Sequence, residues 1–147
     1  MDLDETREVL RQCRTFAVVG LSPKPFRDSH RVARFLQEHG YRIIPVYPRE
    51  ERILGETCYR ALRDIPEPVD VVDLFRRSEA VEPFVDEAIA IGAKVIWMQL
   101  GVVHEPAAEK ARRAGLRVVM DRLHSHIDPN SPEFTANRDR MQALVAE

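Results

Sequence analysis

The apolar residues of this chain are concentrated in short runs that are hydrophobic at nearly every position rather than at every second one. Five such runs occur, at residues 16–19, 43–46, 69–74, 95–98 and 118–120. A strand that is apolar on both faces is typical of a parallel sheet covered by helices on both sides. The pattern therefore predicts about five buried, mainly parallel strands.

A unit of helix, glycine and strand recurs along the sequence. It reads FLQEHGYRIIPV at 35–46, AIAIGAKVIWM at 88–98 and ARRAGLRVVM at 111–120. In each copy the glycine (Gly40, Gly92 or Gly115) stands where a helix ends in a left-handed residue. Helices that alternate with buried strands favour a doubly wound α/β fold of three layers. We expect residues 1–147 to form one domain, with an N-terminal helix at 1–14 and a variable tail at 123–147.

Local signals mark where the helices begin. Asp28 or Ser29 is a suitable N-cap for the helix that follows the first strand. Pro83 and Pro106 suit the first position of two further helices, because proline is tolerated there. The second of these helices is rich in alanine. Residues 48–68 predict a loop with one or two helical turns, and residues 135–146 predict a final helix.

Composition and charge narrow the class of protein. The chain has 147 residues, of which 44% are hydrophobic and 31% charged, and a formal net charge of -2. This balance is ordinary for a globular domain and provides no basic field for nucleic acid. Two cysteines without a C-x-x-C pair favour a reducing compartment. No apolar run approaches the roughly 20 residues that span a bilayer, and the charged N-terminus lacks a signal-peptide pattern. We expect a cytoplasmic protein that binds neither nucleic acid nor membranes.

The loop after the first strand, GLSPKPFR at 20–27, carries the strongest functional signal. In an open parallel sheet, ligands bind beyond the carboxyl ends of the strands. Gly20 permits a tight turn there, and Ser22 offers a hydroxyl. Lys24 and Arg27 bring positive charge to a helix N-terminus, which itself attracts anions. His30, in the first turn of that helix, is a candidate for contact with a ligand or with the backbone. We favour a phosphate site here over an ordinary solvated loop.

The common nucleotide fingerprints are absent around this loop. An NAD site requires G-x-G-x-x-G and an acidic residue at the tip of the second strand. Here the loop reads G-L-S-P-K-P, and the second strand ends Val46-Tyr47-Pro48-Arg49. No P-loop motif occurs either. An arginine at this tip suits a ligand that carries an additional ribose phosphate, so NADP and CoA-type ligands stay open.

At these residues the sequence resembles the small stand-alone CoA-binding proteins, which are related to the CoA-binding domain of the succinyl-CoA synthetase alpha subunit. The matching stretches are VVGLSPKPFRDSHRVARFL, GYRIIPVYP, DVVDLFRRSEAV and AIAIGAKVIWMQLGVVHEPAAEKARRAGLRVVMDR, which together span about residues 16–122. The resemblance implies a Rossmann-like fold and CoA or acyl-CoA as the ligand. It implies that the loop 20–27 holds the pyrophosphate and ribose phosphate.

The resemblance also implies how the remaining strand ends contribute. Tyr47 and Pro48, after Val46, would flank the adenine. The rest of the cleft would be lined by Phe75, Arg76, Gln99 and Gly101. The chain departs from the family at two positions. Tyr47 stands where the family commonly has asparagine, and Leu123 stands where it tends to have cysteine, which argues against a thiol role there.

The resemblance implies a CoA-holding domain without the synthetase's chemistry, so we expect no catalytic residues. Two alternatives stay open: an NADP-linked or acyl-CoA-transforming enzyme, and a ligand-modulated interaction module with an unidentified protein partner. The second would use the alanine-rich helix, although packing of that helix on its own sheet is favoured. His124 and His126 lie near a strand end at a spacing that suits a metal. A polar rim without metal is the favoured interpretation.

Overall fold

The fold is a five-stranded parallel sheet between two layers of helices. The structure is a computed structural model, and it describes residues 3–99, 102 and 104–120. The strands have the order β2-β1-β5-β6-β7 and all pair in parallel. Their bounds are Thr15–Val19 for β1, Arg42–Val46 for β2, Val71–Leu74 for β5, Val95–Met98 for β6 and Arg117–Met120 for β7. The predicted strands and the doubly wound Rossmann-like class are confirmed.

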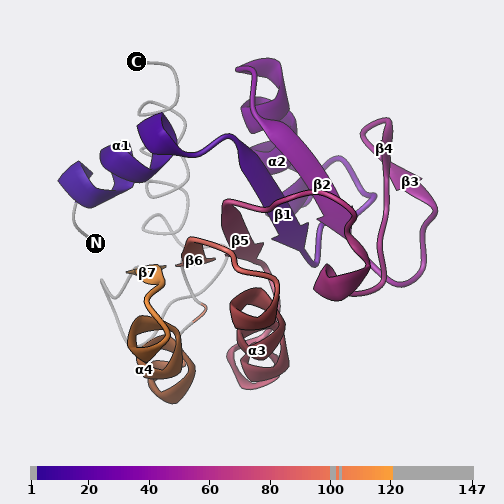
Figure 1. Ribbon diagram of the computed structural model, residues 1–147. Helices are drawn as coiled ribbons and strands as arrows, with labels where there is room; N and C mark the ends of the chain where they lie inside the picture. The colour runs from indigo at the N-terminus through magenta and orange to yellow at the C-terminus, as the bar shows by residue number, and fades with distance from the viewer. Residues whose placement is uncertain (1–2, 100–101, 103, 121–147) are drawn as a thin grey trace.

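Helices cover both faces of this sheet (Figure 1). The helices α1 (Leu3–Gln12) and α2 (Asp28–Glu38) lie on one face, and α3 (Glu82–Ala90) and α4 (Glu105–Arg113) lie on the other. Each face has its own buried apolar cluster. Because β2 follows β1 on one side while β5, β6 and β7 continue on the other, the strand order reverses between β1 and β5. Ligands of doubly wound proteins bind at such a point.

The central strand β5 buries its apolar residues on both faces of the sheet. Val72 and Leu74 of β5 belong to the cluster under α3 and α4, whereas Val71 belongs to the cluster under α1 and α2. The alanine-rich face of α4 joins the first cluster, with Ala107 and Ala108 fully buried. This face packs on the chain's own sheet, which is the arrangement that the sequence favours for this helix.

The helix ends follow the sequence signals in part. Gly40, Gly92 and Gly115 have φ values of +88°, +77° and +93°, as predicted for residues that end a helix. The predicted N-cap of α2 is wrong, because α2 already begins at Asp28 and Arg27 occupies the cap without a side-chain hydrogen bond. The expected prolines lie one residue further in, since α3 begins at Glu82 and α4 at Glu105.

Residues 48–68 contain a small hairpin that the sequence pattern does not predict. The strands β3 (Arg52–Ile53) and β4 (Glu56–Thr57) are antiparallel, and a short 3-10 turn, η1 (Leu62–Asp64), follows. Strands of two residues are too short to show a period. The hairpin is held from outside, because Ile53 is buried in the α2-side cluster and the Gln37 amide donates to the Leu54 carbonyl at 3.0 Å.

A second 3-10 turn, η2 (Ser78–Ala80), precedes α3. Within the described residues, no helix is both long and apolar enough to cross a bilayer. The predicted helix at 135–146 and the tail from 123 lie outside the described residues.

Candidate functional site

The carboxyl ends of the strands are joined by hydrogen bonds that extend the sheet by one residue. The amide N–H of Gly20 donates to the Val46 carbonyl at 3.0 Å, and that of Phe75 donates to the Val19 carbonyl at 2.9 Å. The loops after β1, β2 and β5 therefore begin side by side at the point where the strand order reverses. The structure thus brings together the first residues of three loops that the sequence predicts for one site.

Gly20 lies at the closest approach of two of these loops. Its φ is +83°, and a Cβ built on it would meet the Phe75 carbonyl oxygen and the Arg76 Cδ at 2.9 Å each. Real Cβ atoms essentially never approach other atoms so closely. Glycine is therefore required at this position for two reasons, its backbone conformation and its lack of a side chain. The contact also places the aliphatic part of Arg76 against the start of the loop 20–27.

The loop 20–27 is folded back onto the first turn of α2. The Ser22 N–H donates to the Ser29 Oγ at 3.0 Å, and the Lys24 N–H donates to the Ser22 Oγ at 3.1 Å. The His30 Nδ1 lies 2.9 Å from the Ser22 carbonyl, so this nitrogen carries the proton and donates it. Ser29 and His30 are both buried. Of the two contacts expected for His30, the structure contains the one to the backbone.

Ser29 has a contact that the sequence does not predict. Its position at a helix start indicates an N-cap, and its hydroxyl instead holds the loop before the helix. A serine seven residues beyond Ser22 offers no sequence signal for such a contact, because only the folding back of the loop brings the two together.

Four cations lie in the first and third loops of this edge, namely Lys24, Arg27, Arg76 and Arg77. All four are exposed, and within the described part of the chain none of them forms an ion pair. Some cations elsewhere are paired: Arg42 contacts Glu67 and Glu56, and Lys110 contacts Glu82 and Asp86. The N-terminus of α2, with its positive end of the helix dipole, lies in the same loop. The edge therefore carries positive charge that an anion could neutralise.

The end of β2 adds a half-buried aromatic residue. The Tyr47 N–H donates to the Tyr59 carbonyl at 3.0 Å, which fixes the backbone where the strand ends. Tyr47 is partly buried against the α2-side cluster, and the following Pro48 and Arg49 are exposed. Arg49 thus lies at the tip of the second strand, as the sequence predicts.

The end of β6 brings an amide and a carboxyl group together. The Gln99 N–H lies 3.5 Å from the Leu74 carbonyl, and its Nε2 donates to the Asp73 Oδ1 at 2.5 Å. Asp73 is 0% exposed, and its Oδ2 has no hydrogen-bond partner. Burial raises the pKa of Asp73 to about 7, although the hydrogen bond from Gln99 acts in the opposite direction.

The two thiols and His104 occupy structural positions elsewhere in the described part of the chain. Burial raises the pKa of the Cys13 thiol, and burial together with Glu50 raises that of Cys58 to about 11. His104 is the N-cap of α4, because its Nδ1 accepts from the Ala107 N–H at 3.1 Å. The described residues contain no group of His, Cys, Asp and Glu that could hold a metal. Gly101, His124 and His126 lie outside the described residues.

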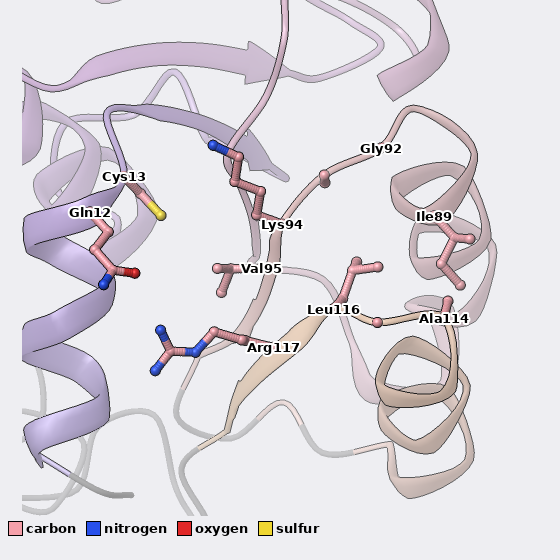
Figure 2. Close-up of a pocket in the computed structure, with 11 residues that line it drawn as sticks. Gln12, Cys13, Ile89, Gly92, Lys94, Val95, Ala114, Leu116 and Arg117 are labelled. Atoms are coloured by element: carbon pink, nitrogen blue, oxygen red, sulfur yellow. The ribbon is translucent and has the colours of Figure 1, made fainter.

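A hollow of about 470 Å³ lies at the opposite, amino edge of the sheet (Figure 2). It is bordered by the ends of α1, α3 and α4, and Lys94 and Arg117 lie along it. Lys94 pairs with Asp70 at 3.3 Å, and Arg117 pairs with Glu8 at 3.4 Å. Because both cations are paired, this hollow offers less free positive charge than the carboxyl edge.

Comparisons with known proteins show the family and the fold of the chain. The family model described as a CoA binding domain matches residues 14–124. The chain is 40% identical to the Bacillus subtilis (strain 168) protein YneT over 117 residues, which is 80% of this chain and 87% of that protein. A solved structure of a hypothetical protein from Pyrococcus horikoshii OT3 superimposes with a TM-score of 0.81 at 37% identity, covering 96% of this chain and 92% of that one.

A larger protein contains a related region. The alpha subunit of the ADP-forming acetate–CoA ligase II from Pyrococcus furiosus is 24% identical over 149 residues. The match covers 91% of this chain and 33% of that subunit. The chain thus corresponds to about a third of the ligase subunit.

Proposed function

Because the chain belongs to the family of CoA-binding domains, we propose that it binds coenzyme A or an acyl-CoA at the carboxyl edge of its sheet. The observation that carries this proposal is the meeting of Gly20 and Arg76. It joins two loops with exposed, unpaired cations at the point where the strand order reverses. CoA carries a pyrophosphate and a 3′-phosphate, and clustered cations beside a helix N-terminus stabilise such groups.

Each segment of the edge has a proposed part in holding the ligand. The pyrophosphate and ribose phosphate are bound by the loop of Gly20, Ser22, Lys24 and Arg27, which Ser29 and His30 hold in place. Tyr47 and Pro48 flank the adenine beyond Val46. The pantetheine passes along the residues Phe75, Arg76, Gln99 and Gly101. Two prolines, Pro23 and Pro25, reduce the entropy lost when the loop orders around the ligand.

We further propose that the protein is a cytoplasmic binder without catalytic machinery of its own. Both thiols have a raised pKa, which keeps them protonated, and both cysteines are free. Asp73, whose pKa lies near neutrality, is enclosed and not open to a substrate. The protein could then carry, sense or present CoA within a larger system.

One observation favours a second candidate. Arg49 is exposed at the tip of β2, where an arginine accommodates a 2′-phosphate in NADP-dependent enzymes. The two candidates differ in their ligand, so one binding experiment separates them.

The experiment is calorimetric titration of the protein with CoA, 3′-dephospho-CoA, NADP and NAD at the same salt concentration. We expect CoA to bind and to bind more weakly without its 3′-phosphate. Lys24→Glu and Arg27→Glu should each weaken CoA binding, and the binding should fall with rising salt. Arg113→Glu, an exposed charge reversal on α4, is the matched control. Tighter binding of NADP than of CoA would establish the second candidate, and equal CoA affinity in all three variants would refute the loop assignment.

A further inference from the structure

Phe26 is an unusual surface residue. It is 63% exposed, and it is the one large hydrophobic side chain exposed among the residues that the structure describes. It lies within the loop 20–27, between the exposed cations Lys24 and Arg27. An aromatic ring in water loses the hydrophobic stabilisation that burial would provide. Its position beside a cationic edge suggests that a ligand covers it.

The backbone presents Phe26 in a fixed position. The Arg27 N–H donates to the Lys24 carbonyl at 3.1 Å, which closes a turn over residues 24–27. Pro25 occupies the second position of this turn, where its fixed φ is favoured. Phe26 follows with an ordinary negative φ, since Leu54 is the one non-glycine residue of the described chain with a positive φ. The backbone that carries the ring therefore has little conformational entropy left to lose when a ligand binds there.

The root of the same loop is also held. Ser29 and His30 bind the backbone of Ser22 from the first turn of α2. The turn that carries Phe26 is thus supported on both sides, by this anchor and by the helix that begins at Asp28. Such support is of use for a recognition residue, because it sets the ring at a constant place relative to the cations.

The ring is paired with a positive charge. The Arg27 guanidinium carbon lies 5.4 Å from the centroid of the Phe26 ring, within the range of a cation–π contact. The two side chains together offer an aromatic surface, a planar guanidinium and a charge. A flat, electron-rich base attached to phosphate groups matches all three properties, because bases stack on both aromatic rings and guanidinium planes.

We propose that the Phe26 ring, with the Arg27 guanidinium beside it, forms a stacking platform for the adenine base of the ligand, while the charge of Arg27 keeps its proposed part in binding the phosphates. This proposal rests on the proposed CoA function and deepens it by assigning a residue that discriminates for the nucleotide end of CoA. The platform lies in the loop after β1, and Tyr47 lies in the loop after β2. The Gly20–Val46 hydrogen bond joins the starts of these two loops, so both border the same part of the carboxyl edge of the sheet.

The test separates the two ends of CoA. The probes are CoA, adenosine 3′,5′-bisphosphate and 4′-phosphopantetheine, titrated into the wild type, Phe26→Ala, Phe26→Leu and Phe26→Trp. Loss of base stacking corresponds to about 5- to 150-fold weaker binding, since a stacked base contributes about 1–3 kcal/mol. We expect Phe26→Ala and Phe26→Leu to weaken CoA and adenosine bisphosphate binding by at least about 5-fold. Binding of 4′-phosphopantetheine should be unchanged, and Phe26→Trp should retain the affinity for CoA.

Each other outcome overturns the proposal in a recognisable way. If Phe26→Ala binds CoA as the wild type does while Lys24→Glu binds it weakly, the platform is refuted and the CoA function stands. Equal weakening of all three probes would assign Phe26 to loop structure. Failure of the wild type to bind any of the probes would overturn both the platform and the CoA function.

Discussion

Gln99 and Asp73 form a hydrogen bond of 2.5 Å inside the core, between the ends of β6 and β5. The contact satisfies one carboxyl oxygen of Asp73 and leaves the other without a partner. An ionised carboxylate in such a place loses its hydration without full compensation. Burial therefore raises the pKa of Asp73 from 3.8 to about 7.

This raised pKa predicts that Asp73 destabilises the fold as the pH rises. Between about pH 4 and pH 7 the folded state holds a proton on Asp73 that the unfolded state has released, so stability falls with rising pH. Asp73→Asn removes the ionisable group and should be more stable than the wild type at pH 8. One unit of pKa shift corresponds to about 1.4 kcal/mol, so the free energy of unfolding of Asp73→Asn at pH 8 should exceed that of the wild type by several kcal/mol. Urea denaturation at pH 5 and pH 8 measures it, and an equal difference at both values would contradict the prediction.

Asp70 should have the opposite pH dependence. Burial alone would raise its pKa, but hydrogen bonds from the backbone N–H groups of Arg14 and Thr15 and from Lys94 hold the pKa below 3.8. The folded state thus favours the ionised form, and this stability is present above about pH 4 and lost as the pH falls. Asp70→Asn should cost about 1–2 kcal/mol at pH 7. The loss in free energy of unfolding should be smaller at pH 3 in the same denaturation series. An equal loss at pH 3 and pH 7 would refute the stabilisation by the ionised Asp70 carboxylate.

Gly20 and Gly40 provide a matched pair of substitutions. Both have a positive φ, but a Cβ on Gly40 would meet nothing within 4 Å, whereas one on Gly20 would meet Phe75 and Arg76. Gly40→Ala should therefore lower the free energy of unfolding only by the cost of placing alanine at a positive φ, about 1–2 kcal/mol. Gly20→Ala should lose at least about 1 kcal/mol more, since overpacking costs about 1–3 kcal/mol. It should also weaken CoA binding, while Gly40→Ala should not. Thermal unfolding and calorimetry measure both effects, and equal losses would show that the close approach at Gly20 relaxes freely.

Ser29→Ala should loosen the loop 20–27 without unfolding the domain. It removes the acceptor for the Ser22 N–H, while the helical backbone at Ser29 is unchanged. Trypsin should then cleave after Arg27 faster than in the wild type, and CoA should protect this bond. Thr57→Ala, at an exposed position of β4, is the control and should cleave as the wild type does. Unchanged cleavage in Ser29→Ala would show that the His30 contact alone holds the loop.

Much of the fold could be read from the sequence because its signals are local or repeated. Runs such as Val95–Met98 are apolar at every position, which burial on both faces requires. The hairpin of β3 and β4 could not be read, since its two-residue strands are held by Ile53 and Gln37 contacts from elsewhere. The N-cap of α2 was predicted at the wrong residue for a related reason, because Ser29 has a partner in the loop that its own neighbourhood does not reveal.

The sequence by itself determined the strands, the helix-ending glycines and the candidate loop, since each depends on residues close together in the chain. Only the tertiary structure decided which loops meet. The order β2-β1-β5-β6-β7 brings Gly20 against Arg76, 56 positions away, and encloses Asp73 beside Gln99. These contacts depend on strand pairing and on how side chains fill the remaining space, and neither is encoded in any short stretch of sequence. The meeting of these loops is therefore a product of the sheet order, although the residues proposed for the site could be named beforehand, apart from Phe26 and the loop contact of Ser29.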